Sequence, residues 1–168
     1  MNSVARSDLD HVIRSTLDDA GLGYQRVAEG EFLVTLPGTH KLGTMCWLVV
    51  GEHAMLVEAF VMRRPDEGHE RLYHFMLRRN ARMYGVSFCL DPDGDVYLVG
   101  RVPLHAVNPA ELDRLLGSVL SYADENFNTM LEIGFGSSIR REWAWRASRG
   151  ESLANLQAFA RFANPDRG

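Results

Sequence analysis

The 168-residue chain has a single lysine, two cysteines and no long apolar run, and each shortage excludes a class of protein. Its longest apolar stretch, Met45–Val50, is far too short to cross a bilayer, which takes about 20 apolar residues. The first 20 residues follow an amphipathic helical pattern and lack the apolar core of a signal peptide. We therefore expect a cytoplasmic protein that does not insert into membranes.

The two cysteines are not arranged for disulfide scaffolding or catalysis. Cys46 and Cys89 each lie inside an apolar run typical of a β-strand, which predicts two buried free thiols. A disulfide between them is the alternative. Neither cysteine has the sequence surroundings of a catalytic nucleophile.

The basic residues are almost entirely arginine. Lys41 and seventeen arginines are set against 22 acidic residues, which gives a net charge of −4. A net acidic chain lacks the overall field of a dedicated nucleic-acid binder. Hydrophobic residues make up 46% of the chain and charged residues 24%, which are the values of an ordinary globular domain.

No local motif indicates a metal site, a cofactor site or a catalytic centre. His69 and His74 are five residues apart, so on a helix they point about 140° away from each other and cannot share a zinc ion. Asp91–Asp95 begins like a calcium loop but runs into a strand, which favours a hairpin turn. Gly134–Ser138 lacks the lysine of a phosphate-binding loop and follows a helix, which favours a helix break. The sequence predicts no cofactor, no metal and no catalytic residues.

Hydrophobic periodicity predicts an α+β domain: a twisted antiparallel sheet with helices packed on it, followed by a C-terminal helical arm. Residues 1–134 are expected to form the main domain and residues 135–168 the arm, a helical extension of the same domain. Because the strands come in hairpins, the order of elements argues against a doubly wound nucleotide-binding fold. The expected helices are Asp8–Ala20, Pro65–Tyr84, one starting after Asn108 and broken at Gly134–Gly136, Ser138–Ser148 and Glu151–Phe162. The expected strands are Tyr24–Ala28, Glu31–Leu36, Thr44–Val50, Ala54–Val61, Val86–Leu90 and Val96–Val102.

The second expected helix has an arginine face opposite its apolar face. At 100° per residue, three arginines fall within about 40° of one another. They are Arg71, Arg78 and Arg82, with Phe75 beside them. This face is either a solvated surface with ion pairs to Glu67 and Glu70, or a docking surface, since arginine and aromatic residues are enriched where partners bind. Asn80 lies towards the apolar side, where its amide needs hydrogen-bond partners.

The arm contains two of the three tryptophans. On a helix, Trp143 and Trp145 lie about 200° apart, so one surface cannot bury both. Either the arm is sandwiched within its own chain, or one tryptophan contacts another molecule, because an exposed indole forfeits a large apolar contact.

Several strand and helix segments carry a family resemblance. They are Thr44–Val50, Leu56–Val61, Leu77–Asn80, Phe88–Asp91 and Gly94–Leu98. Over about Leu9–Met130 the chain resembles the YbjN family, which is named for sensory-transduction or stress regulators, whereas the arm looks like an extension found in one branch. The resemblance implies a fold like that of type III secretion chaperones, often homodimeric, which hold partly unfolded or extended clients on exposed apolar surface.

Two functional hypotheses follow. The first is a non-enzymatic, dimeric chaperone-like or adaptor protein that binds a protein partner or client, with the sheet face and the third helix supplying the dimer contact or an apolar groove. Its expected partner-binding residues are Arg71, Phe75, Arg78, Arg82, Trp143 and Trp145. The second is a regulatory domain that senses a small anion near the arginines, including Arg101 and Arg140. An enzyme ranks third, and direct nucleic-acid binding ranks below it.

Overall fold

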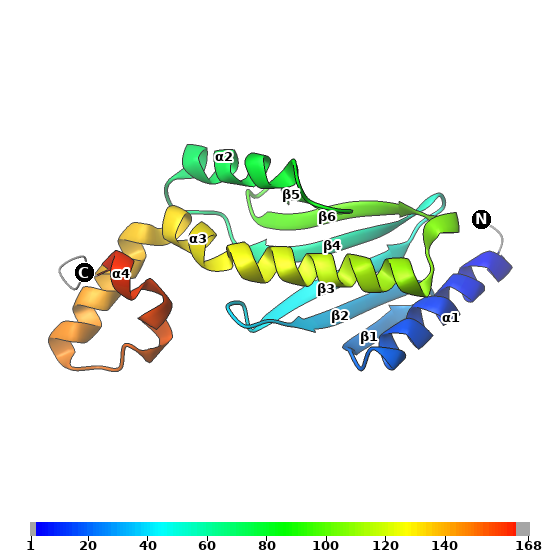
Figure 1. Ribbon diagram of the computed structural model, residues 1–168, viewed down its shortest axis with the longest axis horizontal. Helices are drawn as coiled ribbons and strands as arrows, with labels where there is room; N and C mark the ends of the chain where they lie inside the picture. The colour runs from blue at the N-terminus through cyan, green and yellow to red at the C-terminus, as the bar shows by residue number, and fades with distance from the viewer. Residues whose placement is uncertain (1–2, 164–168) are drawn as a thin grey trace.

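A computed structural model describes residues 3–163 and shows a six-stranded antiparallel sheet with helices against it, the predicted α+β class. The strands are β1 (Gly23–Ala28), β2 (Glu31–Pro37), β3 (Gly43–Val50), β4 (Ala54–Met62), β5 (Ser87–Leu90) and β6 (Val96–Pro103). Their order in the sheet is β1-β2-β3-β4-β6-β5, and every neighbouring pair is antiparallel. The predicted hairpins are confirmed. The hairpin β5–β6 pairs with β4 through β6, so β5 forms one edge of the sheet (Figure 1).

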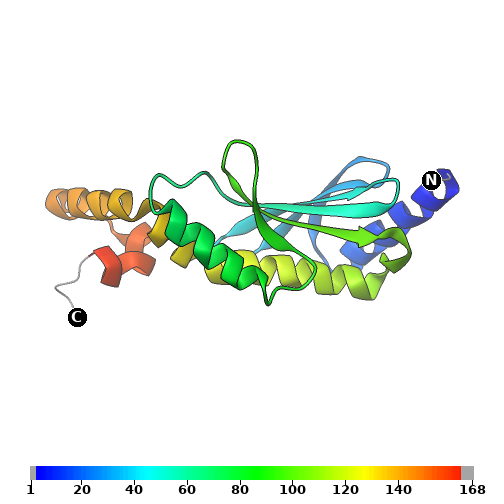
Figure 2. The ribbon, with the colours of Figure 1, turned by 90° about the horizontal axis from the view of Figure 1, so that it is seen from above.

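The helices are α1 (Ser3–Asp19), α2 (His69–Asn80), η1 (Leu104–Ala106), α3 (Pro109–Arg149), η2 (Ala154–Phe159) and α4 (Ala160–Ala163). Those that pack on the sheet, α1, α2 and the first part of α3, lie on one face of it and leave the other face uncovered (Figure 2). On β4, the alternating side chains of Met55, Val57, Ala59 and Val61 face the helices and are each at most 1% exposed. The alternate side chains of this strand, Glu58 and Phe60 among them, face the uncovered side and stay partly exposed.

The first helix begins five residues earlier than the sequence predicts. Arg6, in the additional turn, donates from Nη2 to the Val50 carbonyl at 2.6 Å and from Nε to the Glu29 carbonyl at 3.1 Å. These carbonyls belong to the turn before β2 and to the end of β3. The additional turn is therefore anchored to the sheet by contacts that the local sequence pattern does not reveal.

The second helix is shorter than predicted at both ends. Gly68 takes a left-handed conformation, with φ of 65°, and interrupts the expected first turn. The amides of Asp66 and Glu67, which the prediction placed inside the helix, donate instead to the Gly134 carbonyl at 3.0 and 3.1 Å. The helix ends at Asn80 rather than Tyr84, because the Asn80 side chain is engaged with the neighbouring strand β5.

The predicted requirement of Asn80 for hydrogen-bond partners is confirmed. Its Nδ2 donates to the Phe88 carbonyl at 3.1 Å, and the Phe88 amide donates to its Oδ1 at 2.7 Å. The side chain therefore pairs with β5 as a backbone segment would, and it fixes the end of α2 to the sheet.

The third helix starts as predicted and is kinked, not ended, at the glycine pair. The Asn108 side chain caps it by accepting from the Glu111 amide at 3.0 Å, with Pro109 at the first helical position. At Phe135 the backbone is non-helical, with φ of −137° and ψ of 18°, and the helix then resumes to Arg149. The expected separate helix Ser138–Ser148 is the continuation of α3.

After Gly150, which ends α3 in a left-handed conformation, the chain doubles back along the outer part of that helix. The expected helix Glu151–Phe162 is replaced by the 3₁₀ segment η2 and the single turn α4. Arg140 stacks over the Phe162 ring, with its guanidinium carbon 4.1 Å from the ring centroid. The arm therefore forms a small lobe beyond the end of the sheet (Figure 1); its last residues, 164–168, lie outside the described residues.

The apolar stripe of α3 is buried inside the chain. Its members are between 0% and 4% exposed, apart from the partly buried Phe127. They are Leu112, Leu116, Val119, Ala123 and Met130. These side chains pack against the sheet of the same chain, so the dimer contact or apolar groove expected from the third helix has to use its other side chains.

Candidate functional site

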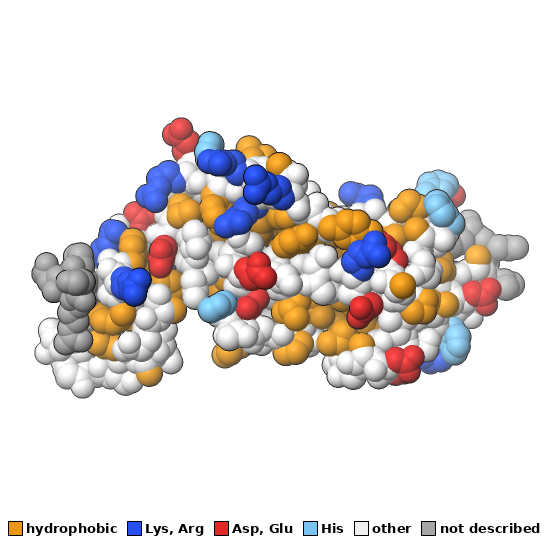
Figure 3. Space-filling view, in the orientation of Figure 1, with side chains coloured by type: hydrophobic (Ala, Val, Ile, Leu, Met, Phe, Trp, Pro, Cys, Tyr) orange, Lys and Arg blue, Asp and Glu red, His pale blue; other side chains and the backbone are white. Residues whose placement is uncertain are grey.

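A groove of about 1010 Å³ runs between α2 and α3. One wall comes from α2 and the turn after it, and contains four of the predicted partner-binding residues: Arg71, Phe75, Arg78 and Arg82. The other wall comes from α3 and contains Tyr122, Glu125, Asn126 and Ile133. In the space-filling view, blue side chains gather over α2, with orange side chains between them and α3 (Figure 3).

The arginines of this groove have no carboxylate partner among residues 3–163. None of the ion pairs within that range includes Arg71, Arg78, Arg79 or Arg82. Arg79 instead lies 5.1 Å from the centroid of the Phe75 ring, a cation–π contact. The ion pairs to Glu67 and Glu70 expected for a merely solvated face are not formed, so the guanidinium groups are exposed with no carboxylate of the described residues at ion-pair distance.

Glu67 serves a different purpose. Its carboxylate accepts from the Ser137 amide and, at 2.8 Å, from the Ser137 hydroxyl, where α3 restarts after the kink. These hydrogen bonds from the Ser137 amide and hydroxyl lower the pKa of Glu67. The carboxylate therefore caps the outer part of α3.

Both ends of the groove are fixed by contacts between its walls. At one end, the Tyr84 amide donates to the Tyr122 hydroxyl at 2.8 Å, just beyond α2. At the other end, the Gly134 carbonyl accepts the two amides that precede Gly68. Gly68 also lies so close to the Ile133 carbonyl that an added Cβ would come within 2.4 Å of that oxygen. The separation of α2 from α3 is thus set by a backbone-to-hydroxyl hydrogen bond at one end and by backbone contacts at the other.

The two tryptophans of the predicted site lie elsewhere, in the arm. Trp143 is 8% exposed and buried within the chain, whereas Trp145 is 49% exposed. Arg149 lies 5.0 Å from the Trp145 ring centroid. The predicted site is therefore divided: four residues meet in the groove, one tryptophan is a packing residue, and the other lies on a separate surface.

Sequence reasoning missed the α3 wall of the groove. Tyr122, Asn126 and Ile133 flank the apolar stripe of α3 at offsets of 4 and 11 residues, a spacing that keeps them near one side of the helix. That signal was available in the sequence. What it could not show is that this side of α3 lies next to α2, because the neighbour is set by the strand order.

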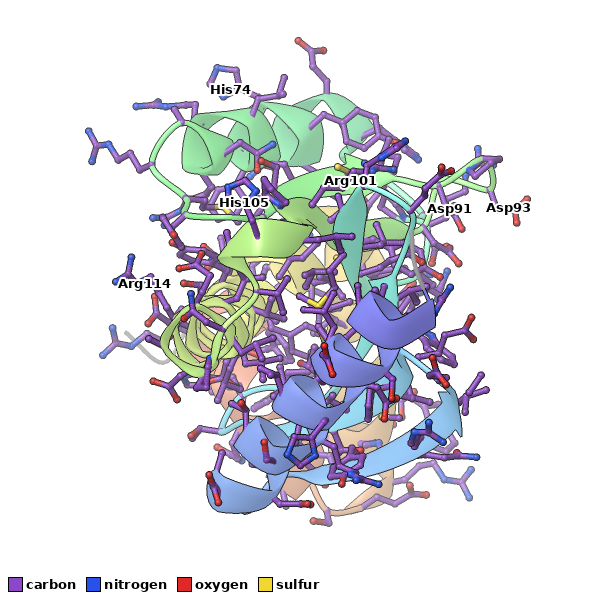
Figure 4. The ribbon with its side chains drawn as sticks, turned by 90° about the vertical axis from the view of Figure 1, so that its right-hand side faces the viewer. His74, Asp91, Asp93, Arg101, His105 and Arg114 are labelled. Carbon is purple, nitrogen blue, oxygen red and sulfur yellow. The ribbon has the colours of Figure 1, made fainter. Side chains whose placement is uncertain are left out.

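The polar and nucleophilic side chains outside the groove do not converge. Figure 4 shows several polar side chains that come from different elements and point in different directions: His74, which lines the groove, points outward from α2, and the two aspartates lie at the tip of the β5–β6 hairpin. Those labelled are His74, Asp91, Asp93, Arg101, His105 and Arg114. Within residues 3–163, no group of three or more His, Cys, Asp or Glu residues could hold a metal ion.

Both cysteines are free thiols, so the disulfide alternative is not formed. Cys46 is completely buried, as predicted, whereas Cys89 is only partly buried. Burial raises the pKa of the Cys46 thiol to about 12, which keeps it protonated at neutral pH.

None of the helices in the described part of the chain is both long enough and apolar enough to span a bilayer.

A comparison of the sequence with protein-family models assigns the chain to a family. Residues 10–132 match the YbjN model, described as "Putative bacterial sensory transduction regulator". The chain belongs to the YbjN family. The predicted resemblance is therefore confirmed over the second half of α1, the sheet, α2 and most of the part of α3 that precedes the kink.

Mycobacterial relatives extend beyond the family model. An uncharacterized protein of Mycobacterium tuberculosis strain H37Rv is 52% identical over 157 residues, covering 90% of this chain and 86% of its own. An uncharacterized protein of Mycobacterium leprae is 52% identical over 154 residues, with 89% and 84% covered. This similarity spans more of the chain than the family model does.

Solved structures with the same fold include type III secretion chaperones. A chain of the ExsC–ExsE complex has a TM-score of 0.56 at 17% identity, with 77% of this chain and 97% of that chain covered. A chain of the HopA1–SchA chaperone–effector complex gives 0.55 at 11% identity, with 73% and 95% covered. The Yersinia pestis type III secretion chaperone SycH, in complex with a fragment of YscM2, gives 0.50 at 18% identity, with 68% and 96% covered. At these identities the likeness shows the fold, and the predicted fold class is confirmed.

Proposed function

We propose that this YbjN-family protein is a chaperone-like adaptor that binds a protein partner in the groove between α2 and α3 and acts by binding, without catalysis. The observation that carries the proposal is the unpaired arginine row along this groove, with Phe75 between its members. Arginine and aromatic side chains are enriched at binding hot spots. The fold shared with chains of chaperone–effector complexes supports binding of a protein and not of a small molecule.

The size and lining of the groove also favour a protein segment over a small anion. Its volume of about 1010 Å³ lies at the upper end for small-ligand pockets, about 300–1,000 Å³. Glu70 and Glu125 line it together with the arginines. Carboxylates repel a small phosphate anion, whereas a peptide that carries apolar groups and charges of both signs can be arranged to suit them.

We further propose that the protein is a cytoplasmic homodimer, with residues 1–134 as the family domain and residues 135–168 as its helical extension. The uncovered sheet face supports a dimer because it presents large apolar side chains, including Met45 at 43% and Phe60 at 37% exposure. Trp145 offers a second, smaller contact surface in the arm.

Photocrosslinking from two positions of α2 tests the proposed groove. A benzophenone amino acid replaces Phe75 inside the groove, or Leu77, which is 69% exposed and does not line the groove. In cells of the native host, we expect position 75 to capture a distinct partner that position 77 does not, with Arg78→Ala reducing the yield at least fivefold. Equal capture from both positions, or none from either, would contradict the groove as a binding site.

A further inference from the structure

The α2–α3 groove is a local positive surface on a negative protein. Four arginines line it, Arg71, Arg78, Arg79 and Arg82, against two carboxylates, Glu70 and Glu125. The whole chain has a net charge of −4. The groove lining thus carries an excess of positive charge, and it would attract a negatively charged ligand to this place on the surface.

The arginines form a row with helical spacing. Arg71 and Arg78 lie two turns apart on α2, about 10 Å along the helix axis at a rise of 1.5 Å per residue. Arg82 lies just beyond the end of α2 and continues the row. A second helix lying along α2 and carrying acidic residues seven positions apart would place one carboxylate opposite each of the first two arginines.

Apolar side chains occupy the floor of the groove between these charges. Phe75 and Met83 on the α2 side and Ile133 on α3 all line it, and each is only partly buried. Apolar surface of this kind is stabilised when another apolar side chain covers it. Apolar floor and charged rim together match the mode in which an amphipathic helix lies in a groove.

The charged residues of the groove walls favour a peptide ligand over a nucleic acid. A polyanion such as RNA would place phosphates next to Glu70 and Glu125, and both carboxylates repel phosphate. A peptide helix can place neutral or basic residues at those two positions and keep its acids for the arginines. The mixture of charges therefore favours a patterned acidic peptide over a uniformly charged chain.

We propose that the groove binds an acidic amphipathic helix of a partner protein. Its carboxylates, seven residues apart, pair with Arg71 and Arg78, and its apolar side chains cover Phe75 and Ile133. This inference rests on the proposed function, because it names the partner chemistry of the same groove. Bidentate pairing of guanidinium with carboxylate fixes the register of the bound helix along α2.

A charge-swap experiment tests it. The probe is a fluorescent, end-blocked helical peptide with glutamates at two positions seven residues apart and leucines on the adjacent face, and a second version has lysine in place of both glutamates. Fluorescence anisotropy measures binding to the full-length protein, to R71E/R78E, and to the control R14E/R101E, whose exposed arginines lie outside the groove.

We expect the wild-type protein and R14E/R101E to bind the glutamate peptide at least tenfold more tightly than the lysine peptide. R71E/R78E should lose that preference and bind the lysine peptide best, a reversal that also shows the variant is folded. Affinity for the glutamate peptide should fall as salt is raised. Equal affinity of the wild-type protein for both peptides overturns the proposal.

Two competitor molecules, an RNA oligonucleotide and inorganic phosphate, test whether the groove recognises phosphate instead of the peptide. If a single-stranded RNA oligonucleotide binds more tightly than the glutamate peptide, or if millimolar inorganic phosphate displaces the peptide completely, the groove recognises phosphate and the proposal is wrong. If the crosslinker at Phe75 captures a partner while the glutamate peptide does not bind, this inference fails and the proposed function stands. If neither captures nor binds, both fail.

Discussion

Asp10 joins three parts of the chain through one buried carboxylate. The residue is 6% exposed on α1, and its Oδ1 accepts from the Arg26 Nε at 2.9 Å and from the buried Gly30 amide at 2.8 Å. Burial alone would raise the pKa of Asp10, but the hydrogen bonds from Arg26 and Gly30 and the nearby positive charges outweigh it and hold that pKa below its usual value. The ionised form is thus the one that the folded protein stabilises.

The effect of pH on stability follows from the sign of that shift. A carboxyl group whose pKa is lower in the folded state stabilises the protein above its unfolded pKa, about 3.9 for Asp, and loses that contribution as pH falls through the folded value. We therefore expect Asp10→Asn to flatten the decline of unfolding free energy below about pH 4. Urea titrations from pH 3 to pH 7 measure this slope.

A comparison of Asp10→Ala with Asp10→Asn shows how much the acceptor oxygen for the Gly30 amide contributes to stability. At pH 7 we expect Asp10→Ala to lower the free energy of unfolding by about 2 kcal/mol, because it leaves the buried Gly30 amide without an acceptor. Asp10→Asn keeps an acceptor oxygen and should cost less. Asp8→Asn, on the exposed side of the same helix, is the matched control and should stay within about 0.5 kcal/mol. Equal losses in Asp8 and Asp10 variants would show that the buried carboxylate has no special role.

At the scale of elements, the junction of α2 with the α3 kink positions the groove. Gly68 has φ of 65°, and an added Cβ would lie 2.4 Å from the Ile133 carbonyl oxygen. A side chain there meets both a backbone conformation it disfavours and a carbonyl that cannot move without shifting α3. We expect Gly68→Ala to lower the free energy of unfolding by about 2–3 kcal/mol and to weaken binding in the groove.

Gly117 provides the matched control on α3. It is exposed in the middle of the helix, and an added Cβ would meet nothing within 4 Å. Gly117→Ala should therefore stabilise the protein by about 1 kcal/mol, since alanine has the higher helix propensity. Urea unfolding followed by tryptophan fluorescence measures both variants. A Gly68→Ala protein as stable as the parent would contradict the tight junction.

The same junction shows where sequence reasoning succeeded and where it stopped. Helical spacing alone placed Asn80 at the boundary of the apolar face and predicted its need for partners, and it placed Trp143 and Trp145 on opposite sides of a helix. Both predictions depend on local geometry. The start of α2 was wrong because Asp66 donates to the Gly134 carbonyl, a partner 68 residues away that no local pattern contains.

For the groove, sequence predicted one wall and missed the other. The arginine face of α2 follows from its own periodicity, whereas Tyr122 and Ile133 join it only because α3 lies beside α2 on the same face of the sheet. That arrangement depends on β6 pairing with β4 and placing β5 at the edge. Strand order is a long-range property, so the site could be predicted only in part.

At the scale of the whole molecule, the sheet is covered on one side only. The uncovered face presents apolar side chains from neighbouring strands, and strand pairing places Trp47 opposite Leu33 on one side and Glu58 on the other. Phe60 pairs with Tyr97 across β4 and β6, and their rings pack edge to face at 5.5 Å. A largely apolar face of this kind, with Glu58 as a charged residue within it, is rarely left open to water in a monomer.

A second copy of the chain is the proposed cover, and its test is the mass in solution. We expect light scattering to give twice the chain mass of 18.9 kDa at micromolar concentrations. Phe60→Glu should shift this mass to that of the monomer, since the contact loses the apolar surface of Phe60 and the new carboxylate loses hydration when it is buried. Because Phe60 faces outward, the variant should retain the circular dichroism of the parent.

Leu77→Glu is the control for this experiment, because Leu77 is an equally apolar and more exposed residue on α2, away from the open face. It should leave the dimer intact. A parent protein that stays monomeric up to 100 micromolar would remove the dimer from the proposal. Dissociation by Leu77→Glu and not by Phe60→Glu would move the contact from the sheet to α2. In that case the dimer and the partner would compete for the helix that carries the arginines, and binding of the glutamate peptide would weaken as protein concentration rises.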